Sequence, residues 1–188
     1  MIPVLYERFQ DWCKNGSVYI ISDTHFDDDD CIKMDPNWMN PEDAIAIIKK
    51  TVHKCDTLIH LGDVGNLEYM KQIKGHKVLI MGNHDTSVTK YKEVFDEVYE
   101  GPLMIGEKLL LSHEPILGID WALNIHGHDH SGRYIDKFHL NMASNVCGFK
   151  PMSLGEYVKK CGLSKIKSLH RDTIDNATER KRKRTKKN

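Results

Sequence analysis

The sequence predicts a layered α/β domain that contains two β-sheets. Residues 17–81 contain three apolar, strand-like runs with helix-like segments between them, and from residue 97 onward short strands follow one another. Strand–helix–strand units followed by a series of strands are typical of domains that stack helices and sheets in layers. The chain of 188 residues suits a single domain, which we place at residues 1–178.

The first half alternates predicted strands and helices. Residues 17–22 (SVYIIS) are rich in β-branched and aromatic side chains, as expected of a buried strand, and residues 56–61 and 76–81 have the same character. Pro41 opens a predicted helix with one apolar stripe. The stripe consists of Ala44, Ile45, Ile48 and Val52. A shorter helix is predicted over residues 67–73.

The second half predicts mainly short strands with turn residues between them. After a predicted helix over residues 88–95, the strand-like segments are 97–101, 102–106, 108–112, 122–126 and 138–142. A last helix is predicted over residues 153–162. Such closely spaced strands indicate that the second half supplies most of a second sheet.

Composition excludes several classes of protein. No stretch approaches the roughly 20 apolar residues of a membrane span, and the charged N-terminal residues do not form a signal peptide. The five cysteines are scattered and form no C-x-x-C pair, which argues against a disulfide framework or a thiolate zinc site. We therefore expect a cytoplasmic protein with no membrane contact.

The net charge of zero conceals a basic C-terminal tail. Residues 180–188 hold seven of the 27 Lys and Arg residues and no acidic residue, which leaves residues 1–179 with 20 basic and 27 acidic residues. We expect residues 179–188 to form a disordered tail. Clustered Lys and Arg bind phosphates without reading sequence, so weak contact with nucleic acid through this tail is one hypothesis.

Polar side chains follow several predicted strands at the point where each strand ends. In chain order they are Asp23, His25, Asp63, Asn83, His84, Asp85, His113, His126, His128 and His130. In open α/β sheets, the loops at the carboxyl ends of the strands surround the ligand crevice. If the strands share a sheet, we expect these side chains to converge on one pocket.

The spacing and chemistry of these residues suit metal ions. Asp23 and His25 are two residues apart, as are His128 and His130, which would place each pair on one face of an extended backbone. Carboxylate, amide and imidazole ligands without thiolate favour Mn²⁺, Fe, Zn²⁺, Ni²⁺ or Co²⁺ over Ca²⁺ and Mg²⁺. Seven to eight candidates exceed the four ligands of one zinc ion, so we expect two ions that share a bridging carboxylate.

Taken together, these residues resemble the calcineurin-like metallophosphoesterases, whose pattern is D-x-H, G-D, G-N-H-[DE], a single His and G-H-x-H. The chain carries all five blocks in that order, as Asp23-Thr-His25, Gly62-Asp63, Gly82-Asn83-His84-Asp85, His113 and Gly127-His128-Asp129-His130. The chain is most similar to small stand-alone bacterial and phage phosphoesterases, over residues up to about 158. It lacks the longer G-D-x-V-D-R-G block of the protein Ser/Thr phosphatases.

The resemblance implies a fold and a set of residue roles. The implied fold is a four-layer α/β/β/α sandwich of two mixed sheets flanked by helices. The implied ligands are Asp23, His25, Asp63 and His130 for one ion, and Asp63, Asn83, His113 and His128 for the other. His84 would be the catalytic histidine, and Asp85 would hold its imidazole in the useful tautomer. The strand periodicity alone does not choose two of His126, His128 and His130; the family pattern selects His128 and His130.

The implied activity is metal-dependent hydrolysis of phosphate monoesters or diesters by attack of a metal-bound hydroxide, with manganese the favoured ion. Two alternatives remain open. One is a nuclease whose strand is held by the basic tail, and the other is a non-catalytic metal-binding scaffold. Asp27–Asp30 are expected to form a flexible acidic loop at the mouth of the site, and Arg133 to be either a phosphate contact or a surface residue. The remaining histidines, His53, His60, His76, His139 and His170, are expected to be structural or solvated.

Overall fold

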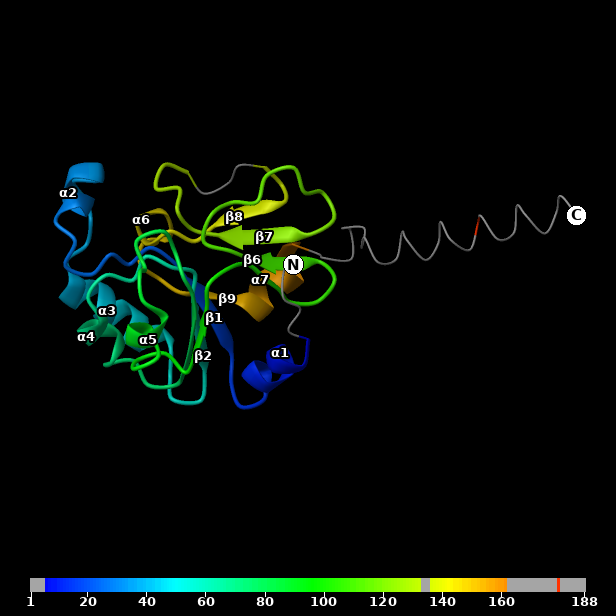
Figure 1. The fold of residues 1–188 in the computed structure, drawn as a ribbon, viewed down its shortest axis with the longest axis horizontal. Helices are drawn as coiled ribbons and strands as arrows, with labels where there is room; N and C mark the ends of the chain where they lie inside the picture. The colour runs from blue at the N-terminus through cyan, green and yellow to red at the C-terminus, as the bar shows by residue number, and fades with distance from the viewer. Residues whose placement is uncertain (1–5, 133–135, 162–178, 180–188) are drawn as a thin grey trace, which may run out of the picture.

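The computed structural model of the protein describes residues 6–132, 136–161 and 179. In chain order the elements are α1 (Tyr6–Cys13), β1 (Val18–Ile21), α2 (Asp30–Met34), α3 (Pro41–Thr51), β2 (Thr57–His60), α4 (Leu67–Met70), β3 (His76–Ile80), α5 (Val88–Tyr91), β4 (Glu97–Tyr99), β5 (Leu103–Met104), β6 (Leu109–Leu111), β7 (Leu123–His126), β8 (His139–Asn141), α6 (Ser144–Cys147), β9 (Met152–Ser153) and α7 (Leu154–Cys161). Figure 1 shows their arrangement.

The strands of the described residues form two mixed sheets. The first has the order β4-β3-β2-β1-β9, in which β1 to β4 are parallel and β9 runs antiparallel to β1. The second has the order β5-β6-β7-β8, in which β6, β7 and β8 are parallel and β5 is antiparallel. The predicted α/β architecture of two mixed sheets flanked by helices is therefore confirmed.

The strands β1 to β4 of the first sheet contribute to two hydrophobic cores because successive side chains point to opposite faces. Ile20 and Ile59 pack between the two sheets, together with Leu111 and Ile125 of the second sheet. On the other face, the core contains strand residues such as Leu58 and the apolar stripe of α3. All four residues of that stripe are buried, as predicted.

The helix α3 begins where the sequence predicts. Pro41 occupies the first turn, and the side chain of Asn40 accepts a hydrogen bond from the Asp43 backbone N–H at 2.9 Å. This cap satisfies one of the N–H groups that the start of a helix leaves without a partner. The helix ends at Thr51, so it is shorter than the apolar pattern suggests.

Some elements differ from the predictions. The short elements α1, α2, α6 and β9 do not follow from the sequence patterns, and the helix predicted over residues 88–95 covers only Val88–Tyr91.

None of the described helices has the length and apolarity needed to cross a membrane. The predicted tail lies outside the described residues, apart from Glu179, and so does Arg133.

Candidate metal centre

The loops that follow five parallel strands, three in one sheet and two in the other, meet at one edge of the sheets. Backbone hydrogen bonds tie neighbouring loops together, from Asp23 N to Gly62 O at 2.9 Å and from Gly127 N to His113 O at 2.8 Å. A further bond joins the two sheets, because His128 N donates to the Asp23 carboxylate at 2.9 Å. The strand ends converge as expected, but the strands belong to two sheets and not to the single sheet that the expectation assumed.

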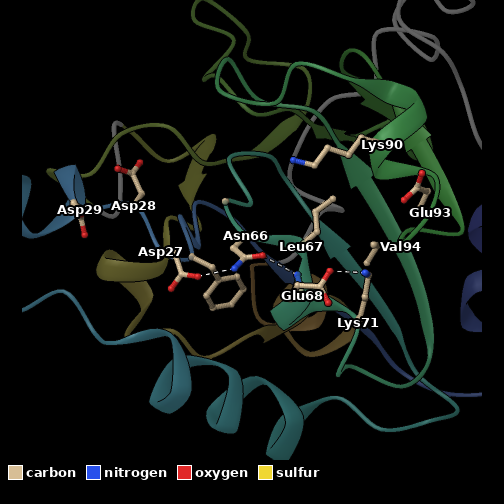
Figure 2. Close-up of a pocket in the computed structure, with 12 residues that line it drawn as sticks. Asp27, Asp28, Asp29, Asn66, Leu67, Glu68, Lys71, Lys90, Glu93 and Val94 are labelled. Atoms are coloured by element: carbon tan, nitrogen blue, oxygen red, sulfur yellow. Dashed lines mark hydrogen bonds and ion pairs between the residues drawn. The ribbon is translucent and has the colours of Figure 1, made fainter.

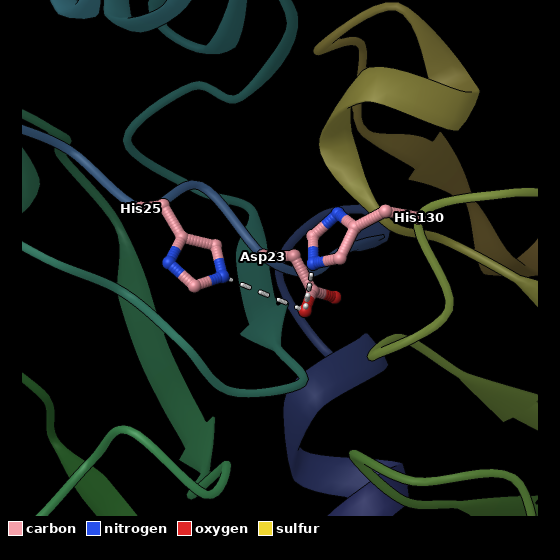
Figure 3. A group of neighbouring side chains, drawn as sticks. All are labelled: Asp23, His25 and His130. Carbon is pink, nitrogen blue, oxygen red and sulfur yellow. Dashed lines mark ion pairs between the residues drawn. The ribbon is translucent and has the colours of Figure 1, made fainter. Parts of the chain in front are cut away.

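Asp23, His25 and His130 form a first group of possible metal ligands. Figure 3 shows that both imidazoles point toward the Asp23 carboxylate. His130 Nε2 lies 3.7 Å and His25 Nε2 lies 4.0 Å from Asp23 Oδ1. His25 Nε2 is also 3.6 Å from Asp63 Oδ2, so the Asp63 carboxylate faces the same space.

The opposite ring nitrogens of these two histidines have their own partners. His25 Nδ1 lies 3.0 Å from Asp28 Oδ2, and His130 Nδ1 lies 3.2 Å from Asn145 Oδ1. Because both partners are acceptors, Nδ1 carries the proton and Nε2 presents a lone pair. His25 Nε2 is buried and has no hydrogen-bond partner among the described residues. A buried lone pair that faces carboxylates is unfavourable by itself, and a metal cation would satisfy it.

Asp63, Asn83, His113 and His128 form a second group directly beside the first. His113 Nε2 lies 3.3 Å from Asp63 Oδ2, 2.9 Å from Asn83 Oδ1 and 3.2 Å from His128 Nδ1. His113 Nδ1 donates to Leu61 O at 2.8 Å, so in the neutral ring Nε2 is a lone-pair donor. Four nitrogen and oxygen electron-pair donors therefore converge, which is the ligand set of a divalent transition metal.

The charges of the pocket favour a cation. Burial raises the pKa of the Asp63 carboxyl, but the hydrogen bond and charge of His113 outweigh this and bring the pKa to about 2. Burial lowers the pKa of His113, yet the carboxylates of Asp63 and Asp23 more than offset it and raise the pKa. The site thus holds an ionised carboxylate and stabilises positive charge. Asp63 is shared, because its Oδ2 atom faces both groups.

The backbone at the ligands is strained. Asp23, His25, Asp63 and His128 all have positive φ angles, of 54°, 41°, 55° and 67°. The left-handed region costs a non-glycine residue roughly 1–3 kcal/mol and is concentrated at functional sites. The expectation that the Asp23–His25 and His128–His130 pairs lie on extended backbone is therefore wrong. Tight turns, rather than strand periodicity, bring these side chains together.

Asp85 connects two loops of the centre through backbone hydrogen bonds. Its buried carboxylate accepts hydrogen bonds from the backbone N–H groups of Asp63 at 2.8 Å, Val64 at 3.3 Å and Gly82 at 2.9 Å. Within the described part of the chain, no hydrogen bond joins Asp85 to the His84 ring. The carboxylate ties the loops after β2 and β3 together, and its role in orienting the His84 imidazole stays a prediction.

His84 lies at the exposed mouth of the site. Its backbone N–H donates to Asp63 Oδ1 at 2.9 Å, while its ring stands edge-on to the His25 ring with centroids 5.4 Å apart. The imidazole is therefore exposed to solvent, next to a ligand of the first group.

The acidic residues 27–30 have hydrogen-bond partners on α4 and lead into a helix, which the expectation of an acidic loop did not include. Asp27 accepts hydrogen bonds from Asn66 Nδ2 at 2.6 Å and from the Tyr69 hydroxyl at 3.3 Å, and Asp30 begins α2. Asp28 orients His25, a role that the sequence reasoning missed. An acid three residues after a candidate His ligand is the signal that could have revealed it.

The histidines outside the five motif blocks are mostly structural. His126 is fully buried, with Nδ1 2.8 Å from Gly127 O, so it does not join either ligand group. His60 is also buried, which lowers its pKa to about 4, and its neutral ring bonds Thr24 Oγ1 at 3.0 Å and Gly62 N at 3.2 Å. His60 therefore supports the turns that carry Asp23 and Asp63. His170 lies outside the described residues.

A cleft of about 560 Å³ lies beside the acidic loop. Figure 2 shows Lys90 extended along this cleft, while Lys71 is paired with Glu68 at 2.5 Å. Five acidic side chains and two lysines line it: Asp27, Asp28, Asp29, Glu68, Glu93, Lys71 and Lys90. This surplus of negative charge would repel a polyanion.

Comparison with known proteins identifies the family. A model of the calcineurin-like phosphoesterase superfamily domain matches residues 17–149. The chain belongs to the calcineurin-like phosphoesterase superfamily. The matched range contains all five motif blocks and both ligand groups, so the shared domain includes the whole candidate centre. Members of this superfamily are generally metal-dependent phosphoesterases, which agrees with the candidate metal ligands of the centre; among the described residues, a further possible group consists of His25, Asp28 and Cys31.

Two similar proteins are matched over most of their length. The chain is 29% identical to the uncharacterized protein MJ1445 of Methanocaldococcus jannaschii, over 79% of this chain and 93% of that protein. A crystal structure of the protein of unknown function AQ665 from Aquifex aeolicus superposes with a TM-score of 0.65 at 30% identity, covering 76% of this chain and 98% of that one. The names of both relatives assign no substrate.

Proposed function

We propose that the protein is a dinuclear metal-dependent hydrolase of small phosphate esters. The observation that carries this proposal is the position of Asp63, whose ionised carboxylate faces the unpartnered Nε2 atom of His25 on one side and the Nε2 atom of His113 on the other. Two clusters of lone pairs around one shared carboxylate fit two cations better than one. When bound, the ions would activate a water molecule and neutralise the phosphoryl oxygens.

The residues divide between the two ions by proximity. Asp23, His25, Asp63 and His130 would hold the first ion, and Asp63, Asn83, His113 and His128 would hold the second. Nitrogen and oxygen ligands of this kind accept Mn²⁺, Fe, Zn²⁺, Ni²⁺ and Co²⁺, and we propose Mn²⁺ because the set has no thiolate and oxygen supplies half of the protein ligands of each ion. Asp28 and Asn145 would fix the ring orientation of the two histidines they contact.

His84 would assist the departure of the alcohol. Its imidazole is exposed at the mouth of the site and lies beside His25, so a substrate phosphate at the ions would come within its reach. A histidine there can donate a hydrogen bond or a proton to the leaving oxygen. Asp85 would act indirectly, by holding the loops that carry Asp63 and Asn83.

The acidic cleft is connected to the centre through Asp28, which contacts His25, although no candidate ligand lines it; its charge supports small esters over nucleic acid strands as substrates. A nuclease would need a basic groove to hold the phosphate backbone, whereas five of the seven charged side chains in the 560 Å³ cleft are acidic. Deletion of residues 180–188 tests the nuclease alternative. A selective loss of DNA or RNA cleavage, with hydrolysis of a small diester unchanged, would favour it.

A metal-supplemented screen of phosphate monoesters, cyclic nucleotides and linear diesters tests the proposed function. The parent protein should release alcohol and retain about two ions per chain, whereas Asp63→Ala should lose both properties. Asp120→Ala, at an exposed position away from the centre, serves as the control. Hydrolysis by Asp63→Ala at the parent rate would contradict the proposal, and a metal-free, inactive parent would favour the scaffold alternative.

A further inference from the structure

We propose that an apolar pocket beside His25 binds the organic arm of the substrate, and that this arm is an uncharged group of about the size of one aromatic ring. The proposal rests on the proposed phosphoesterase function, because the pocket can select an ester arm only if the phosphate lies at the metal centre. It adds a substrate class and the residues that would recognise it, Trp38 and Ile32.

The pocket adjoins the first ligand group. It has a volume of about 180 Å³, and its walls come from residues 24–29, Ile32 and residues 38–41, so His25 itself is part of the lining. Trp38 provides the apolar wall nearest the centre. Its ring lies edge-on to the His25 ring at a centroid distance of 5.9 Å and is tilted against the His130 ring at 5.5 Å. A group in this pocket would therefore contact His25, a candidate ligand of the first ion.

One exposed apolar side chain, that of Ile32, lines this pocket, and a second, that of Met34, follows it on the same helix. Among the described residues, the large hydrophobic side chains that are exposed are Ile32 at 60%, Met34 at 52% and Leu117 at 68%. Two of the three belong to α2, a helix of five residues whose buried member is Cys31. The helix lies at the periphery of the molecule (Figure 1). Single exposed hydrophobic residues are common, but two on one short helix beside a lined pocket indicate a surface that an apolar group covers.

Size and charge define the group that fits. A dry cavity of about 150 Å³ holds one benzene molecule, so a pocket of about 180 Å³ suits one ring or a short alkyl chain. Asp27, Asp28 and Asp29 also line the pocket, and their carboxylates would repel a second phosphate. The expected substrate is thus a phosphate ester with an uncharged aryl or alkyl arm, rather than a polyphosphate or a polynucleotide.

The reaction with such an ester is a simple hydrolysis. The oxygen of water forms the new bond to phosphorus, the bond between phosphorus and the ester oxygen breaks, and the arm leaves as the neutral alcohol after taking one proton. Trp38 and Ile32 would position the arm and take no part in the proton transfer. Their effect should therefore appear in ligand affinity and in KM.

Isothermal titration of the full chain loaded with Mn²⁺ tests the proposal with two non-hydrolysable ligands, benzylphosphonate and methylphosphonate. We expect benzylphosphonate to bind at least about tenfold more tightly, because its ring would leave water while the phosphonate contacts stay the same. Hydrolysis of benzyl phosphate and methyl phosphate, whose leaving alcohols differ little in acidity, should show the same preference in KM.

Two variants and one control assign the preference to the pocket. Ile32→Asn keeps the fold, because the side chain is 60% exposed, and should reduce the preference for benzylphosphonate several-fold. Trp38→Leu should do the same through the opposite wall. Leu117→Asn, at an exposed position that does not line the pocket, should leave both affinities unchanged.

The outcomes separate the pocket from the catalytic proposal. Equal affinity for the two phosphonates would overturn the pocket assignment, and so would a preference that neither variant reduces. A preference that both variants reduce would support it, even in a protein that hydrolyses neither ester. That last result would count against the proposed function alone.

Discussion

Replacement of Asp85 by Asn should destabilise the protein and weaken metal binding together. The carboxylate is 7% exposed and accepts three backbone hydrogen bonds, two of them at Oδ2 and one at Oδ1. Asparagine has one acceptor oxygen, so the substitution would remove the negative charge and place an NH₂ group against a backbone N–H. Bonds to a charged acceptor contribute about 1.5–3 kcal/mol each, so we expect a loss of about 3 kcal/mol in the free energy of unfolding.

Urea denaturation in the presence of a chelator measures this loss without a contribution from bound metal. A change of about 3 kcal/mol should lower the Tm by roughly 6–12 °C for a chain of this size. A separate titration with Mn²⁺ should show weaker binding, because Asp85 fixes the positions of the loops that contain Asp63 and Gly82 relative to each other. The two measurements distinguish a role in the fold from a role in the chemistry.

Asp56→Asn is the matched control. Asp56 is also buried and accepts backbone hydrogen bonds, from Ser17 N and His53 N at 2.8 Å each, but it precedes β2 and so lies at the opposite end of that strand. The Asp56→Asn variant should be less stable than the parent and should bind Mn²⁺ with the same affinity. The reasoning would be refuted if the free energy of unfolding of Asp85→Asn lay within about 0.5 kcal/mol of the parent value and only the pH dependence of turnover changed. That result would mean that Asp85 serves the His84 imidazole.

Three further substitutions test separate features. Asp28→Asn removes the charged partner of His25 and should weaken Mn²⁺ binding about 10- to 100-fold by titration; an unchanged affinity would show that the contact has no role. Gly127→Ala would place a Cβ atom against an aspartate carboxylate of the centre and should abolish metal retention. Gly132→Ala is the control, because a Cβ atom there meets open space, and this variant should retain the ions. Equal metal retention by the two variants would be inconsistent with the structure. Burial raises the pKa of Glu97, but hydrogen bonds from Trp12, Tyr99 and His76 outweigh it and lower the pKa. Its stabilising contribution is present above the unfolded-state pKa of about 4.3 and is lost as the pH falls, so Glu97→Gln should reduce stability at pH 7 and flatten the fall in Tm below pH 5. Parallel Tm profiles for parent and variant would contradict this.

The sequence predicts the central strands well because strands that are buried on both faces consist of nearly continuous apolar residues. The segments around Ile20, Ile59 and Leu79 are apolar runs of strand length, and each is buried on both faces. The helix α2 and the strand β9 have no comparable pattern in the sequence. The α2 helix has one buried residue, and β9 consists of two residues whose pairing with β1 is a tertiary contact.

In the candidate centre, too, some features follow from the local sequence and others depend on tertiary contacts. The approach of Asp63 to His113 is implied by the family resemblance, because the two residues follow strands of different sheets. Residue types and their positions after strands predict only that the loops of one sheet meet. They do not indicate that Asp63 has a positive φ angle, because this depends on the loop that Asp85 holds from 22 residues away. The contact between His130 and Asn145 likewise depends on the position of α6, which the local pattern does not predict.

Anomalous scattering from crystals grown with Mn²⁺ tests the central claim most directly. We expect two peaks about 3.5–4 Å apart, one on each side of the Asp63 carboxylate. The first should lie within bonding distance of His25 and the second within bonding distance of His113. A single peak, or peaks that do not share Asp63, would contradict the account.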